Sequence, residues 1–265
     1  MSNIIERNNV KIVGNGQQTM VLAHGFGCDQ NMWERLLPFI KDDYRLVLFD
    51  YVGSGQSELS AFSVERYSSI HGYAQDIIDV CTALNIKDAI FVGHSVSCSA
   101  GIVAANKVRS LFSKLILIGP SPCFLNLPPD YLGGFNKADL EELLALLEQN
   151  FVGWANYLAP VVAGVSGEGD IAGELSDSFC STDPFVAKTF AHTTFFADNR
   201  EDFKQNNIPC LLLQHKNDAL APLNVGEYLQ SMTAHSTYRV IDVDGHCAHM
   251  SHPELISTEI KQFLK

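Results

Sequence analysis

Residues 89–97 read AIFVGHSVS and decide the fold that we predict for this chain. The apolar residues 89–92 predict a buried strand, the glycine and histidine predict a sharp turn, and the small residues of 99–105 favour a helix. A strand that runs through a tight turn into a helix is the context of a nucleophile elbow, which presents a serine hydroxyl above a sheet. That serine is Ser95. The match to G-x-S-x-G is incomplete, because Ser97 stands where the last glycine is expected.

Further short apolar runs predict additional strands that would form a sheet with this one. They occupy residues 20–23, 46–49, 115–118 and 210–213. Continuous apolar strands suit a parallel sheet that is covered on both faces, and amphipathic stretches such as residues 73–84 lie between the strands. We therefore predict an α/β fold with a mostly parallel, doubly wound sheet flanked by helices.

The two ends of the chain complete the predicted sheet. Residues 10–13 and the strand near Met20 can form an antiparallel edge. Residues 238–243 read as the last strand, and residues 253–264 read as a closing helix.

Between residues 119 and 209, a stretch of about 90 residues, the sequence predicts no clear buried strand. Leucines over residues 140–147 have helical spacing, and Asp183, followed by a proline, is typical of a helix start. An excursion of this length is usually a functional lid or a small subdomain. We expect a core of residues 1–120 and 207–265 and a helical lid of residues 121–206, without an independent second domain.

Two further residues are expected to activate Ser95, since a serine needs a base and the base needs an orienting carboxylate. In the order serine, acid, histidine, Asp218 follows the run 210–213 and lies 123 residues after Ser95. His246 follows the last predicted strand, 28 residues further on. Asp242 and Asp244 are rivals for the acid, but they lie too near the loop of the histidine itself.

His246 shares its segment with His249 and His252, which raises the alternative of a metal site. The segment lacks a second group of cysteines and histidines at recognisable spacing, so we predict no metal. We expect His249 and His252 to pack or cap near the start of the last helix.

Acyl transfer places negative charge on the carbonyl oxygen, and two backbone N–H groups must point at it. Val96 follows the nucleophile and supplies one. The glycine-rich turn HGFG at residues 24–27 follows an early strand and offers Phe26 as the other. Residues 50–55 lack the third glycine and the acidic residue of a dinucleotide-binding loop, and we expect no cofactor.

Composition limits the compartment and the partners. The net charge of −12 disfavours binding to nucleic acid or to anionic membranes. No apolar run is long enough for a membrane helix, and residues 1–16 lack the pattern of a signal peptide. Seven scattered cysteines suit reduced thiols better than a disulfide framework. We expect a cytoplasmic protein.

With these residues placed, the chain resembles the α/β-hydrolase superfamily and, within it, the RsbQ-like group. That group includes a bacterial sigma-factor-regulating hydrolase and the plant karrikin and strigolactone receptors. The resemblance runs almost end to end, through the motifs at residues 24–30, 49–55, 92–96, 119–123, 133–135, 179–184 and 245–251.

The resemblance implies a four-helix cap inserted after the sixth strand, over a largely apolar pocket with the serine at its floor. The candidates for lining this pocket, besides Phe26, are Phe124, Phe135, Trp154, Tyr157, Phe190 and Phe195. It also implies that a protein partner, a phosphatase or another signalling protein, can engage the cap.

The predicted function is that of a cofactor-independent serine hydrolase acting on a small, apolar ester or lactone. In this role Ser95 attacks, His246 transfers the proton and Asp218 orients His246. The alternative is a ligand-binding signalling module in which hydrolysis is slow or incidental. A dehalogenase is disfavoured because the elbow holds serine rather than aspartate, whereas a cofactor-free haloperoxidase or a C–C hydrolase stays open.

Overall fold

The computed structural model describes residues 3–164 and 170–265, and a seven-stranded sheet forms its centre. The strands are β1 (Lys11–Val13), β2 (Gln18–Ala23), β3 (Tyr44–Leu48), β4 (Ala89–His94), β5 (Phe112–Ile118), β8 (Cys210–Asn217) and β9 (Ser236–Asp244). Their order is β1-β3-β2-β4-β5-β8-β9, and every neighbouring pair is parallel except β1 with β3. The predicted α/β fold with a mostly parallel sheet is confirmed.

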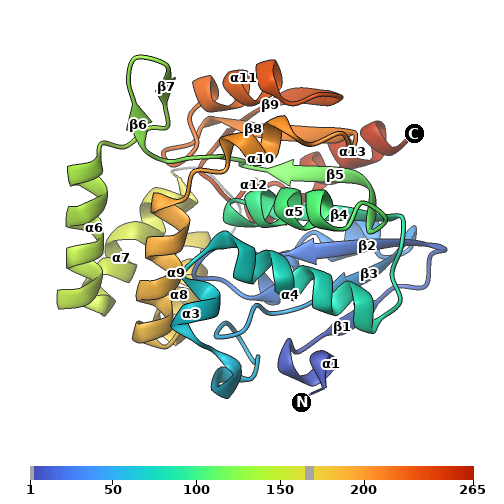
Figure 1. Ribbon diagram of the computed structural model, residues 1–265, viewed down its shortest axis with the longest axis horizontal. Helices are drawn as coiled ribbons and strands as arrows, with labels where there is room; N and C mark the ends of the chain where they lie inside the picture. The colour runs from blue at the N-terminus through green and yellow to red at the C-terminus, as the bar shows by residue number, and fades with distance from the viewer. Residues whose placement is uncertain (1–2, 165–169) are drawn as a thin grey trace.

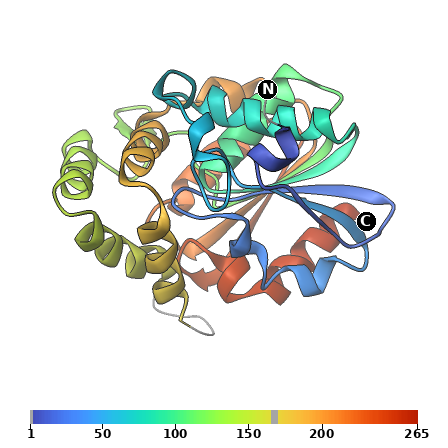
Figure 2. The ribbon, with the colours of Figure 1, turned by 90° about the horizontal axis from the view of Figure 1, so that it is seen from below.

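Helices cover both faces of this sheet, as Figure 2 shows. All six residues of the central strand β4 are buried, as a strand covered on both faces requires. One face packs against the helices that carry Val80, Ala104 and Leu229, and the other against those that carry Ile40 and Ile260. The core therefore lies in two layers, with the sheet between them.

The helices of the core are short except for α4, α5, α11 and α13. They are α1 (Ile4–Arg7), α2 (Leu37–Ile40), α3 (Val64–Tyr67), α4 (Ile70–Ala83), α5 (Val96–Lys107), α10 (Arg200–Lys204), α11 (Leu223–Met232), α12 (Ala248–Ser251) and α13 (Pro253–Leu264), with 3-10 turns η1 (Gln30–Trp33) and η2 (Leu59–Ala61). The predicted closing helix matches α13 from its first residue to its last.

Four helices gather beyond the ends of the strands, on the left of Figure 1. They are α6 (Lys137–Gln149), α7 (Phe151–Ala163), α8 (Ile171–Ser181) and α9 (Pro184–Phe196). Asp183 begins α9 as expected, because its side chain accepts the N–H groups of Phe185 and Val186. A small hairpin of β6 (Asn126–Leu127) and β7 (Tyr131–Leu132), which the sequence did not predict, leads into α6.

Two details of the predicted topology are corrected. The edge strand β1 pairs with β3 rather than with β2, because β2 is buried over Met20–Ala23 and lies between β3 and β4, whereas Lys11 and Ile12 are exposed. The four-helix segment follows the fifth strand of the described sheet, not the sixth, since the antiparallel edge consists of β1 alone.

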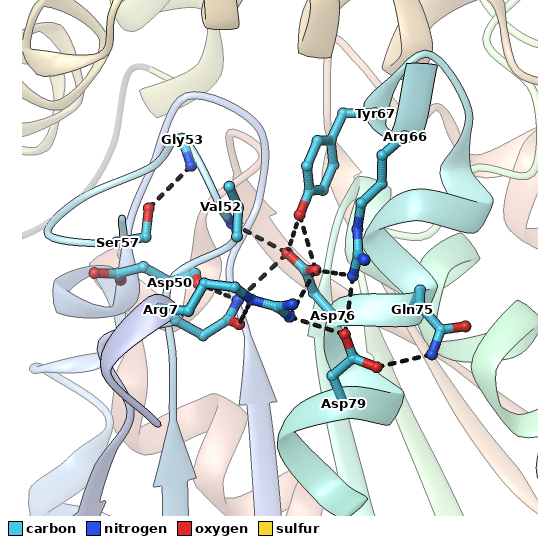
Figure 3. A network of polar contacts seen from close by, with 11 residues as sticks. Arg7, Asp50, Val52, Gly53, Ser57, Arg66, Tyr67, Gln75, Asp76 and Asp79 are labelled. Carbon is cyan, nitrogen blue, oxygen red and sulfur yellow. Dashed lines mark hydrogen bonds and ion pairs between the residues drawn. The ribbon is translucent and has the colours of Figure 1, made fainter. Parts of the chain in front are cut away.

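A buried ionic network ties the N-terminal helix to α4 (Figure 3). Its centre is Asp76, a fully buried carboxylate that accepts hydrogen bonds from Arg7 at 3.2 Å, Arg66 at 2.6 Å and the Tyr67 hydroxyl at 2.9 Å. Asp76 also accepts the N–H of Val52 at 3.1 Å. A buried carboxylate is tolerable only when it is paired and hydrogen-bonded in this way, so the network fixes the turn after β3.

Candidate active site

Ser95 stands at the sharp turn between β4 and α5. Its backbone has φ 56° and ψ −122°, a strained conformation for a residue with a side chain, and its N–H donates to Ile118 at 2.9 Å. Close packing makes the turn possible. A Cβ on Gly93 would lie 2.8 Å from the carbonyl oxygen of Ser97, and one on Gly101 would lie 2.1 Å from the Phe91 ring.

His246 and Asp218 come together beneath the same end of the sheet. The two residues follow the neighbouring strands β9 and β8, and His246 Nδ1 lies 2.7 Å from Asp218 Oδ2. A carboxylate only accepts, so Nδ1 carries the proton and Nε2 keeps its lone pair. The other carboxylate oxygen of Asp218 accepts the N–H groups of Leu220 at 2.8 Å and Ala221 at 3.0 Å.

The charge of Asp218 is maintained although the residue is buried. Burial alone would raise the pKa of this carboxyl, but the imidazoles of His246 and His215 outweigh burial and hold the pKa well below its ordinary range. Asp218 is therefore a carboxylate throughout the neutral range, as an orienting partner of an imidazole must be.

A small cavity connects His246 with Ser95. Both residues line it, and His246 Nε2 has no hydrogen-bond partner within the described part of the chain. The cavity has a volume of about 30 Å³ and is walled mainly by apolar side chains. The four-helix segment contributes Leu158, Val162, Leu175, Phe179, Thr194 and Phe195 to its lining. This volume holds water but no ester, so a substrate must displace lining side chains.

Phe26 and Val96 are the residues predicted to supply the oxyanion N–H groups, and of the two only Phe26 is among the described residues that line the cavity. Val96 follows Ser95 at the start of α5. Of the hydrogen bonds formed by residues 3–164 and 170–265, none uses either N–H as donor. The chain approaches closely here because residue 25 is glycine, where a Cβ would lie 2.6 Å from His94 Nδ1.

The loop that carries Phe26 also touches the four-helix segment. Gly27, with φ 71°, lies under the Phe179 ring, and a Cβ on it would come within 2.4 Å of that ring. Ser178 Oγ donates to the carbonyl oxygen of Gly27 at 2.9 Å. Helix α8 therefore rests directly on the loop.

The model of the alpha/beta hydrolase family matches residues 20–259 of this chain. The chain belongs to this family. The karrikin insensitive 2 receptor CA of Petunia hybrida is 37% identical to it, over 97% of this chain and 95% of the relative. The strigolactone esterase D14 of Arabidopsis thaliana is 35% identical, over 99% and 97%. The structure of the hydrolase olei00960 from Oleispira antarctica has 47% identity and a TM-score of 0.96, covering 99% of this chain and 96% of that one.

The predicted resemblance to α/β hydrolases and to the karrikin and strigolactone receptors is confirmed by these matches. With relatives and structural neighbours named as esterases, the protein is an enzyme that hydrolyses ester bonds. No helix of its described residues is long and apolar enough to cross a membrane.

Only some of the aromatic residues that were expected to line the hydrolase's pocket lie at the cavity. Phe124 and Phe195 line it together with Phe26. Trp154 and Phe190 instead pack behind Phe26, with ring centroids 5.8 and 5.3 Å from its own.

Phe135 and Tyr157 line a second hollow of the hydrolase, of about 430 Å³, between α6, α7 and residues 219–220. It adjoins the cavity, because Leu158 and Leu220 line both. Tyr157 is 61% exposed, because it projects from the side of α7 opposite to the buried stripe. The cavity residues that the sequence reading missed on this helix are Leu158 and Val162. They continue the four-residue spacing from Trp154, so the helical phase of α7 was the signal for them.

His249 is packed in the core rather than placed at the cavity. His249 stacks near Trp33 and His94, with ring centroids 4.6 and 4.5 Å away. Burial lowers the pKa of His249 and of His94, and the neighbouring imidazoles act in the same direction. His252 precedes α13 without capping it through its side chain. Within residues 3–164 and 170–265, no three metal-ligating side chains are grouped as a metal site requires.

Proposed function

We propose that Ser95, His246 and Asp218 form the catalytic triad of an esterase whose substrates are small, uncharged esters or lactones. The observation that carries this proposal is the Asp218–His246 pair, which leaves His246 Nε2 unpartnered in the cavity that Ser95 lines. Catalytic hydrogen bonds are often loose before substrate binds, which accounts for a His246 Nε2 that shares a cavity with Ser95 but has no hydrogen-bond partner among the described residues.

The reaction follows from this arrangement. Ser95 Oγ adds to the carbonyl carbon while His246 Nε2 takes the hydroxyl proton, and the carbonyl oxygen becomes an oxyanion. The N–H groups of Phe26 and Val96 bind that oxyanion. The intermediate collapses, and His246 returns the proton to the leaving alkoxide. Water then attacks the acyl group on Ser95 by the same route and releases the acid. In a lactone, the alcohol stays attached to the acyl group until this second step.

The lining supports an uncharged substrate. Apolar side chains dominate the cavity, and no lysine or arginine is among the described residues that line it. The Asp218 carboxylate is paired with His246. An anionic group would be desolvated there without a cationic partner, at a large cost in free energy. Thr194 offers one polar contact, since its buried hydroxyl has no partner among the described residues.

We also propose that residues 121–206 act as the lid of this site. Helices α7, α8 and α9 supply the roof of a cavity that is too small for an ester, so entry requires these helices or their side chains to shift. A ligand can bias such an equilibrium only by binding the two arrangements unequally.

The test is intact-protein mass after exposure to 4-nitrophenyl butyrate and, separately, to a butenolide ester. We expect one acyl group on the wild-type protein, located on Ser95 by peptide mapping, and none on Ser95→Ala. An adduct on another residue, or an equal adduct on Ser95→Ala, would overturn the triad assignment.

A second function has support from the receptor names of the relatives. In it, the protein binds a ligand for signalling, hydrolysis is slow, and a protein partner such as a phosphatase engages the outer lid surface. Slow turnover of a short-chain ester panel, with a long-lived acyl-enzyme, would favour it. The cysteines, which the structure leaves unpaired, also support a cytoplasmic location for either function.

A charge reversal tests the partner surface. Glu141 is exposed on α6 and pairs with Lys137, a surface ion pair of little energetic weight. Glu141→Lys should weaken binding of a candidate partner phosphatase without changing ester turnover. The exposed Glu254 on α13 provides the control, since Glu254→Lys should change neither. Equal binding by all three proteins would refute a partner site on the lid.

A further inference from the structure

Ser97, the residue that departs from the G-x-S-x-G pattern, is completely buried and makes two hydrogen bonds. Its Oγ lies 2.5 Å from the carbonyl oxygen of His24 and 2.7 Å from the hydroxyl oxygen of Tyr51. A carbonyl oxygen can only accept, so the Ser97 hydroxyl donates to His24. The Tyr51 hydroxyl must then donate to Ser97. A directed chain of hydrogen bonds therefore runs from Tyr51 through Ser97 to the backbone of residue 24.

The imidazole of His24 fixes the next peptide of the same loop. Its Nε2 accepts the N–H of Tyr51 at 3.1 Å, so its proton lies on Nδ1, which donates to the carbonyl oxygen of Gly25 at 2.9 Å. Burial lowers the pKa of His24 although Asp50 and Asp29 act against it, which agrees with a neutral ring.

These contacts, together with the N–H of Cys28, which donates to the same Gly25 carbonyl oxygen at 3.3 Å, determine where the Phe26 N–H points. The carbonyl of Gly25 and the N–H of Phe26 belong to one planar, trans peptide unit, in which the two groups point in opposite directions. Holding the Gly25 carbonyl on His24 thus directs the Phe26 N–H to the other side. The preceding peptide is held at both ends, by Ser97 on the carbonyl of His24 and by Met32 Sδ, 3.4 Å from the N–H of Gly25.

The series of hydrogen bonds from Tyr51 through Ser97 to His24 is held in place at its Tyr51 end. Tyr51 is fully buried and packs edge-on against Tyr73 and Phe190. The following residue, Val52, donates its N–H to Asp76, the centre of the ionic network in Figure 3. The hydroxyl of Tyr51 therefore approaches Ser97 from a rigid support.

We propose that Ser97 and Tyr51 are positioning residues for the oxyanion hole, which act through His24 on the direction of the Phe26 N–H. Neither lines the cavity, so neither touches substrate. The inference rests on the proposed role of the Phe26 N–H in catalysis. It gives a function to the one position at which the elbow departs from the expected motif.

The proposal predicts a particular kinetic defect. An oxyanion contact is made in the transition state and not with the ground-state ester, so its loss lowers kcat and leaves KM unchanged. Removing an oxyanion donor outright costs about 10²- to 10³-fold in kcat. Misdirecting one should cost less, and we expect roughly 10- to 100-fold for Ser97→Ala. Tyr51→Phe removes only the support for Ser97 and should cost a few-fold.

The experiment compares Ser97→Ala with Ser99→Ala. Ser99 is a buried serine of the same helix whose hydroxyl donates to the carbonyl of Ser121 at 3.3 Å, away from the His24 loop. For each variant, kcat and KM are measured with 4-nitrophenyl butyrate, together with the inhibition constant of phenylboronic acid. Ser95 Oγ adds to the boron while His246 takes its proton, and the tetrahedral adduct places an oxygen in the oxyanion hole.

For Ser97→Ala we expect kcat to fall and the inhibition constant to rise by a similar factor, with KM unchanged within about twofold. Ser99→Ala should change none of the three. The proposal is overturned if Ser97→Ala folds and matches wild type in kcat and inhibition, or if both serine variants show the same defect. Should Ser97→Ala fail to fold, wild-type values for Tyr51→Phe overturn it instead. Acylation of Ser95 in wild type separates these outcomes from a failure of the triad itself.

Discussion

Acid should destabilise this protein steeply below pH 6.5, because several of its histidines are buried as neutral rings. His94 and His249 have pKa values well below the ordinary value, with burial as the main cause and neighbouring imidazoles as the second. His24 is shifted in the same direction, although Asp50 offsets part of the effect of burial. In the unfolded chain, all three rings titrate near pH 6.5. The unfolded state therefore binds more protons than the folded state below that pH, and stability is lost as the pH falls.

The size of the effect follows from the number of protons. Each ring that stays neutral in the fold costs up to about 1.4 kcal/mol per pH unit below its unfolded pKa. Between pH 7 and pH 5 this amounts to about 2 kcal/mol for His94 and about the same for His249, with a smaller part from His24. A total of up to ~4 kcal/mol from these two rings is a large share of the 5–15 kcal/mol that stabilises a typical domain.

The assay is urea unfolding at pH 7, 6 and 5, followed by circular dichroism, for wild type and for His249→Gln. The variant removes one buried titrating ring, so its loss of unfolding free energy between pH 7 and 5 should be smaller than that of wild type by about 2 kcal/mol. His71→Gln serves as control, because His71 is exposed on α4, and its loss should equal that of wild type. A wild-type loss under 1 kcal/mol, or equal losses in all three proteins, would refute this reasoning.

Three further outcomes are expected. Ser95→Ala should lower ester turnover about 10⁴- to 10⁶-fold and leave the unfolding free energy within about 1 kcal/mol, since an elbow hydroxyl makes few core contacts; turnover above a tenth of wild type would contradict it. His246→Ala should cost nearly as much, and the double variant little more, because triad members act as a unit; additive losses in rate assays would show separate roles. Phe195→Ala should enlarge the cavity and raise kcat/KM for hexanoate relative to acetate esters, whereas Phe185→Ala, at an exposed position of the same helix outside both linings, should leave that ratio unchanged; equal ratios in both variants would exclude Phe195 from the acyl site.

The sequence could place the three proposed triad residues near one another because parallel strands end at one edge of the sheet. Ser95, Asp218 and His246 each follow a predicted strand, and a parallel sheet brings such positions together without any knowledge of helix packing. The same logic failed for β1, since a short edge strand carries no information on which neighbour it joins.

The residues that line the cavity were harder to predict. The candidates were chosen because they are aromatic, and not by the face of the helix on which they lie. Tyr157 and Leu158 are adjacent in α7, yet Tyr157 is 61% exposed and Leu158 lies at the cavity. Which face of a lid helix points inward depends on packing between segments far apart in sequence. The contact of Ser97 with His24 was beyond reach for the same reason, since it joins an elbow to a loop 73 residues earlier.

The contact of α8 with the glycine loop limits how the substrate range of this enzyme can be changed. Phe179 and Ser178 press on Gly27, next to the residue whose N–H is proposed to hold the oxyanion. Mutations in α8 that are selected for bulkier substrates would therefore change the volume of the cavity and would also disturb the loop that carries the Phe26 N–H. Directed evolution that begins at Leu158 and Val162 on α7 avoids this conflict, because neither of them is among the side chains that press on Gly27. Helix α7 is consequently the better starting point for mutations that change the substrate specificity of this enzyme.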